Sequence, residues 1–112
     1  MISDFIALTP VQNSTTTGLA FALELPDIFN EEDDVMCQCG TVDVRKEDDG
    51  FWGIHIKLHE NFLHLSDGDN YQRDALIESV VINLRIITDL NYEMSDVFLT
   101  DSIGDYKKSL YD

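Results

Sequence analysis

The spacing of hydrophobic residues divides the chain into two kinds of element. Through most of its length apolar and polar residues alternate in short runs, the pattern of strands with one buried face. Between residues 69 and 90 the apolar residues instead recur every three or four positions, the pattern of an amphipathic helix. The sequence therefore predicts an α+β domain in which one helix packs on one face of a sheet.

The predicted helix covers about residues 70–90. Asp69 and Gln72, three positions apart, form a capping box that indicates where it begins. Val81 and Ile86 widen the apolar face, so we expect the helix to lie deep against a flat surface. The apolar face itself consists of Leu76, Ile77, Val80, Leu84, Ile87 and Leu90.

The alternating stretches predict an antiparallel sheet of five to six strands. Leu19, Phe21, Leu23 and Leu25 share one face of a strand that forms a hairpin with the strand before it. Asp49-Gly50 predicts a second hairpin, Gly40 indicates a bulge or bend, and the tail after residue 101 is expected to form a short helical turn. At 112 residues the whole chain, 1–112, fits one domain. The predicted strands are 4–11, 19–25, 35–46, 51–59, 62–65 and 97–100.

The charge of the chain narrows the classes of partner. Twenty-two Asp and Glu against seven Lys and Arg give a net charge of −15. Such a field repels nucleic acid and anionic membranes, and it attracts basic proteins. We therefore expect a basic protein partner, with no direct binding of nucleic acid and no membrane contact.

Features of the termini and of the cysteines predict a cytoplasmic location. The first twenty residues have no basic opening followed by an apolar run, and no segment approaches the roughly 20 apolar residues of a membrane helix. Cys37 and Cys39 lie two apart on a predicted strand, too far for an unstrained disulfide. Two thiols that are not bridged are typical of a reducing compartment.

The sequence contains no complete pattern of a metal-binding or catalytic site. Cys37, Cys39, His55, His59 and His64 lack the paired spacing of a zinc site. The stretch from Asp67 resembles a calcium loop, but Gln72 stands where the loop needs glycine. There is no G-x-S-x-G, glycine-rich phosphate loop or P-loop lysine. We expect no cofactor, no metal and no enzymatic activity.

The candidate site is therefore the acidic residues themselves. Ten carboxylates lie between Glu24 and Asp49, most of them in the loop before the 35–46 strand and in the turn after it. If both connections leave the same end of the sheet, they form one concentrated negative surface. Alternation places Trp52 in the core and Phe51 on the opposite, exposed face, where an aromatic can anchor a partner. The predicted partner-binding residues are Asp27, Glu31, Glu32, Asp33, Asp34, Glu47, Asp48, Asp49 and Phe51.

A small, strongly acidic α+β domain without a catalytic motif or export signal resembles an immunity protein of bacterial toxin systems, including contact-dependent growth inhibition. The resemblance implies binding to a basic toxin, such as a nuclease, with the active site covered and carboxylates in place of substrate phosphates. The resemblance concerns the type of protein and not a sequence motif, so it assigns no role to any residue. It leaves the oligomeric state open.

Two other functions are compatible with the same charge. A nucleic-acid mimic that inhibits restriction or CRISPR proteins needs carboxylates spread in a stripe, for which Asp74, Glu78 and Asp89 on the outer face of the helix are candidates. An acidic adaptor or oligomerisation domain would instead expose a large apolar patch on its helix or sheet. Clustering of the acids around residues 31–34 and 47–49 favours the immunity function.

Overall fold

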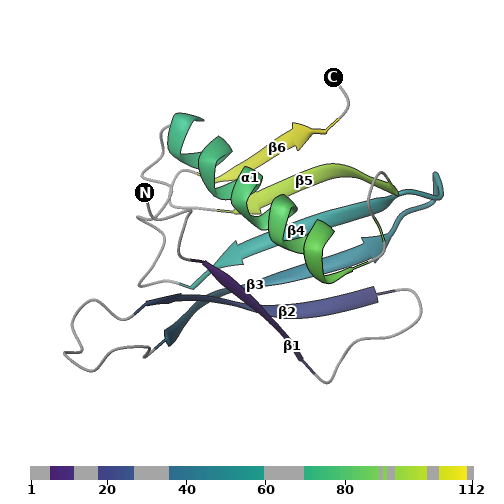
Figure 1. The fold of residues 1–112 in the computed structure, drawn as a ribbon. Helices are drawn as coiled ribbons and strands as arrows, with labels where there is room; N and C mark the ends of the chain where they lie inside the picture. Colours follow the sequence, from purple (N-terminus) through teal and green to yellow (C-terminus); the bar gives the residue numbers. More distant parts are fainter. Residues whose placement is uncertain are drawn as a thin grey trace.

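A computed structural model describes residues 6–11, 18–26, 36–59, 70–88, 90, 93–100 and 104–110. These residues form one mixed sheet and one helix, so the α+β prediction is confirmed (Figure 1). The elements are β1 (Ala7–Pro10), β2 (Gly18–Pro26), β3 (Met36–Lys46), β4 (Trp52–Leu58), α1 (Asn70–Ile87), β5 (Met94–Thr100) and β6 (Asp105–Ser109).

Strands that follow one another in sequence also lie side by side, in the order β1-β2-β3-β4-β5-β6. The hairpins β1–β2 and β3–β4 are antiparallel as predicted, and so are the pairs β2–β3 and β5–β6. The sheet is antiparallel as predicted except between β4 and β5, which are parallel. The reason is that α1 carries the chain back across the sheet, so β5 begins at the same end as β4.

The tail departs from the prediction as well. Instead of a helical turn it forms β6, which pairs with β5 along its whole length. Tyr106 and Leu110 pack against the hydrophobic core from β6 and from the residue after it, and this burial stabilises an extended tail. The strand predicted at 62–65 lies outside the described residues.

The core joins helix and sheet residues in one cluster. Ile77, Val80 and Leu84 of α1 are buried together with strand residues that include Val42 and Ile54. In Figure 1 α1 lies across the sheet, and its chain direction is opposite to that of β4 and β5. Apolar burial of this kind contributes about 25 cal/mol per Å² and is the main stabilising term.

The end of the helix differs from the prediction. α1 stops at Ile87, three residues early, where the Thr88 hydroxyl donates to the Leu84 carbonyl oxygen at 2.6 Å. Ile86 was expected to widen the buried face, but its side chain is 75% exposed, and Ile87 is 46% exposed. Ile86 lies two positions after buried Leu84, which places it on the opposite side of the helix.

Gly40 marks the bulge that the sequence predicts. Leu23 pairs with Gly40 and Glu24 with Gln38, so Cys39 is the extra residue of β3. A Cβ atom at Gly40 would lie 2.5 Å from the backbone oxygen of Lys57 on β4, so only glycine fits. In the described part of the chain no helix is long and apolar enough to cross a membrane.

Candidate functional site

The turn between β3 and β4 positions the acidic residues 47–49 and Phe51. The Glu47 N–H donates to the Phe51 carbonyl oxygen at 2.8 Å, and the Gly50 N–H donates to the Glu47 carbonyl oxygen at 3.0 Å. Gly50 has a φ of 86°, a conformation that favours glycine. The Asp49 carboxylate accepts the Phe51 N–H at 2.9 Å. Asp48 and Asp49 are thereby held on an exposed, closed turn.

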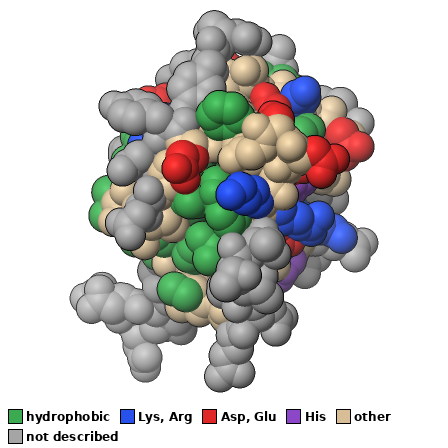
Figure 2. Space-filling model, turned by 90° about the vertical axis from the view of Figure 1, so that its right-hand side faces the viewer, with side chains coloured by type: hydrophobic (Ala, Val, Ile, Leu, Met, Phe, Trp, Pro, Cys, Tyr) green, Lys and Arg blue, Asp and Glu red, His purple; other side chains and the backbone are tan. Residues whose placement is uncertain are grey.

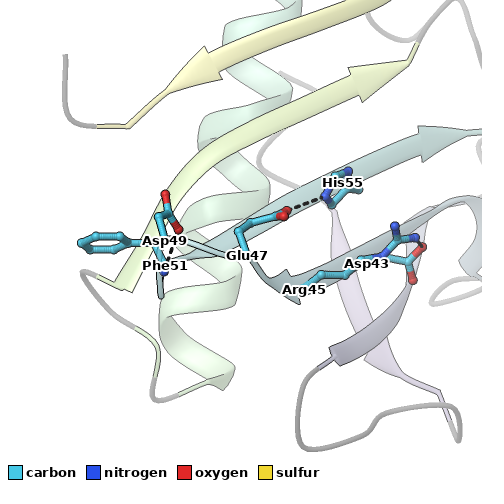
Figure 3. A network of polar contacts seen from close by, with 6 residues as sticks. All are labelled: Asp43, Arg45, Glu47, Asp49, Phe51 and His55. Atoms are coloured by element: carbon cyan, nitrogen blue, oxygen red, sulfur yellow. Dashed lines mark hydrogen bonds and ion pairs between the residues drawn. The ribbon is translucent and has the colours of Figure 1, made fainter.

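The structure places the two aromatic residues after this turn as predicted. Phe51 is 44% exposed and points away from the sheet, whereas Trp52 is 8% exposed and belongs to the core (Figure 3). The alternation of β4 explains the difference, because Trp52 shares its face with the buried Ile54 and Ile56. Phe51 is therefore available to a partner.

Glu47 has an intramolecular partner that the sequence did not predict. Its side chain turns back over β4, and its Oε1 lies 3.2 Å from Nε2 of His55 (Figure 3). Gly53 makes this possible, since a Cβ atom there would collide with the Glu47 carboxylate. Both side chains are partly exposed, so the pair adds little stability, but it orients Glu47 along the sheet and not outward with Asp48 and Asp49.

His55 belongs to a row of side chains on the face of the sheet opposite the buried Ile54. On β5, Phe98 stacks on the His55 ring with centroids 4.8 Å apart and planes at 11°. On β6, Lys107 Nζ lies 5.7 Å from the Phe98 ring centroid. On β3, Asp43 pairs with His55 in register and with Arg45 through an ion pair of 3.5 Å. The row mixes both signs of charge, so it is not part of a negative surface.

The connections that hold the two predicted acidic clusters leave opposite ends of the sheet. Asp27 and residues 31–34 lie outside the described residues, but the segment that holds them joins Pro26 to Met36, which pair at one end of the sheet. The 47–49 turn joins Lys46 to Trp52 at the other end. The eleven residues of β3 separate the two, a length of roughly 33 Å at the rise of a strand.

We call these the Met36 end and the Trp52 end of the sheet. Three connections begin and end on the Met36 side: 27–35 between β2 and β3, 60–69 between β4 and α1, and 101–103 between β5 and β6. By sequence they hold nine carboxylates and no Lys or Arg. The connections on the Trp52 side hold five carboxylates, of which Glu47 faces His55.

The charge of the chain is thus carried mainly by its connections. The described residues include ten Asp or Glu and all seven Lys and Arg, a net charge of −3. The other twelve acidic residues, with no basic one among them, account for the remaining −12. The folded framework is close to neutral.

Asp74 of α1 was a candidate for an exposed acidic stripe, but it is engaged with β6. The Tyr106 hydroxyl donates to Asp74 Oδ1 at 2.8 Å, and Lys108 Nζ lies 3.4 Å from the same oxygen. The hydrogen bond to Asp74, together with burial, raises the pKa of Tyr106 above its usual value of 10.0. Arg73 stacks over the Tyr106 ring at 4.9 Å. This cluster fastens the first half of α1 to the edge strand.

Metal-ligating side chains do not converge within the described residues, where no group of three His, Cys, Asp or Glu could hold an ion. Cys39 is buried, and its Sγ lies 3.4 Å from the Leu23 carbonyl oxygen. Comparison with protein-family models, curated proteins and solved structures found no match for this chain.

Proposed function

We propose that this protein is an inhibitor of the immunity type, which binds and neutralises a basic toxin such as a nuclease. The distribution of charge carries the proposal: a nearly neutral framework holds connections that contribute most of the −15, nine carboxylates of them at the Met36 end. A nuclease surface must be basic to hold a polyanion, and clustered carboxylates attract such a surface and speed association.

The contact surface is proposed to centre on the Met36 end, with Glu31, Glu32 and their neighbours as its main charges. Asp48, Asp49 and Phe51, on the exposed turn at the Trp52 end, lie too far away to contact the same small patch. Covering an active site requires many carboxylates in one place, which favours the first group over the second.

Nucleic-acid mimicry has less support from the described residues. Its stripe requires evenly placed carboxylates on the outer side of α1, but Asp74 is bound by Tyr106 and Lys108. Ile82, Ile86 and Arg85 interrupt the same surface with exposed apolar and basic side chains. Duplex phosphates present neither.

The partner can be identified by affinity capture from cells of the source organism, with washing at low salt and elution at high salt. We expect a basic protein in the high-salt fraction. Its nuclease activity should fall in proportion to added inhibitor and vanish near equimolar amounts. Recovery of a DNA-binding repressor or restriction subunit would support mimicry and reject the immunity function.

Two matched charge reversals test which end binds. Glu31→Lys with Glu32→Lys, and Asp48→Lys with Asp49→Lys, change the net charge of the chain equally, so their long-range effects are matched. The first pair should slow association with the captured toxin at least about tenfold, and the second by less than about threefold. Stopped-flow kinetics at several salt concentrations measures both. Equal effects would show that only net charge matters.

A further inference from the structure

The C-terminal half of α1 exposes isoleucine side chains that no described residue covers. Ile82 is 47% exposed and Ile86 75% exposed. They lie four positions apart, one turn along the helix, so they form a continuous strip on the side away from the buried Val80 and Leu84. Ile87 extends the exposed surface at 46%. Figure 2 views the Trp52 end and shows hydrophobic side chains gathered in the middle of that face.

Two exposed charges of opposite sign flank the strip. Glu78 and Arg85 lie seven positions apart, so two turns of helix place them on the same side of it. When a second helix packs antiparallel across the strip, a residue before the two-fold axis in one helix meets a residue the same distance after the axis in the other. Glu78 of each copy then lies opposite Arg85 of the other, and the two-fold axis forms this ion pair twice.

We propose that this strip joins two copies of the chain in an antiparallel helix pair about a two-fold axis. An isologous contact needs a surface complementary to itself. The axis that pairs Glu78 of one copy with Arg85 of the other passes beside Ile82, so the exposed Ile82 side chains of the two copies meet at the centre of the contact. The proposal does not depend on the identity of any toxin.

A basic partner fits this surface less well than a second copy. The charges of Glu78 and Arg85 beside the strip sum to zero, so the strip offers no net attraction to a basic protein. Self-association also respects the uneven charge of the molecule. The strip lies toward the Trp52 end, whereas the connections with nine carboxylates join at the Met36 end. An antiparallel pair directs the two Met36 ends away from each other, which limits their repulsion.

The contact between two copies is expected to be weak, and salt is expected to strengthen it. Two isoleucines and two charges cover less than the roughly 800 Å² per partner of a standard interface. Two copies at −15 each repel at long range, and salt screens this repulsion more than it weakens a short apolar contact. Dimerisation should therefore become stronger as salt is added.

Sedimentation equilibrium of the purified full chain tests the proposal, from about 10 µM to 1 mM, the range of a weak complex. We expect a monomer–dimer equilibrium that shifts toward dimer at high salt. Ile82→Gln with Ile86→Gln should weaken it at least about tenfold, as expected for a central apolar contact. Glutamine keeps a good helix propensity, so circular dichroism should not change. Val11→Gln, at an exposed apolar residue outside the helix, is the control and should have no effect.

Charge exchange distinguishes a two-fold helix pair from non-specific association. Glu78→Arg and Arg85→Glu should each weaken the dimer, and the double variant should restore it to near the original affinity. A chain that remains monomeric at every concentration overturns the proposal. It is also overturned if the double variant is as weak as the single ones, or if the glutamine variants lose only toxin binding.

Discussion

The two ends of the sheet are built from the same strands but carry different connections. At the Met36 end three segments with nine carboxylates and no Lys or Arg join the elements. At the Trp52 end the β3–β4 turn is closed by backbone hydrogen bonds, one of its carboxylates faces His55, and the exposed isoleucines of α1 lie nearby. One end is suited to long-range attraction and the other to short-range contact.

The difference shows how a chain of such high charge can still fold. Like charges placed opposite each other on neighbouring strands oppose pairing. In the strands acidic and basic residues are nearly equal in number, as in the Asp43–Arg45 pair, and the surplus carboxylates belong to the connections between the elements. Repulsion is then concentrated where it costs the least stability.

Alanine at Gly40 tests how tightly the strands pack toward the Met36 end and should give the largest effect. Its Cβ would lie 2.5 Å from the Lys57 backbone oxygen, which cannot move without disturbing β4. We expect Gly40→Ala to lower the free energy of unfolding by about 2 kcal/mol. Urea denaturation measures it. A loss below about 0.5 kcal/mol would mean that the strands separate easily at the bulge.

Salt should act in opposite directions on the two ends. Raising the salt concentration from 50 mM to 500 mM should weaken the proposed toxin binding at the Met36 end about tenfold or more, because salt screens the attraction between opposite charges. The same change should strengthen the proposed α1 dimer. Isothermal titration and sedimentation, performed on the same protein stock, compare the two. Salt effects of the same sign would remove the distinction between the ends.

The Tyr106 hydroxyl links β6 to Asp74 in the first half of α1. Removing this hydroxyl measures how much the link stabilises the fold. Tyr106→Phe should cost about 1 kcal/mol at neutral pH through the lost hydrogen bond to Asp74. The pKa of Tyr106 is raised in the folded state, so the protonated phenol stabilises the fold. The difference between the two proteins should stay constant up to about pH 10, the ordinary tyrosine pKa, and vanish above the raised pKa. A difference that grows with pH would contradict this.

Gly53 is the counterpart of Gly40 at the Trp52 end and should give the smallest effect. Its added Cβ would meet only the flexible side chain of Glu47. Gly53→Ala should therefore displace Glu47 from His55 and cost about 0.5 kcal/mol, as for an exposed ion pair. The NMR chemical shifts of the His55 ring in both proteins would detect the displacement. An effect as large as that of Gly40→Ala would show that the Glu47 side chain is fixed.

Sequence periodicity was sufficient to predict the local elements. Alternation located β2, β3 and β4, and the spacing of Leu76, Val80 and Leu84 located α1. Periodicity did not predict the direction of β5, because a strand pattern reads the same in parallel and antiparallel pairs. It also missed β6, where Lys108 interrupts the alternation between Tyr106 and Leu110. The Lys108 ammonium group lies 3.4 Å from the Asp74 carboxylate.

The candidate site was predictable only in part. Asp49-Gly50 predicted the turn, and alternation predicted an exposed Phe51 next to a buried Trp52. The placement of the two acidic connections at opposite ends of the sheet could have been predicted, because a loop before a strand and a turn after it must lie at opposite ends of that strand. The contact of Glu47 with His55 could not, since it depends on the space left by Gly53.

The parallel pairing of β4 and β5 has a consequence for how the protein folds. Each pair among β1 to β4 joins consecutive strands, but Trp52 meets Met94 about 42 positions away, across the whole of α1. Closing so long a loop costs entropy before any contact compensates for it. We therefore expect the four N-terminal strands to gain protection from hydrogen exchange early in refolding, and the β4–β5 seam to gain it last. In the native protein the same seam should open first, releasing β5 and β6 as a unit.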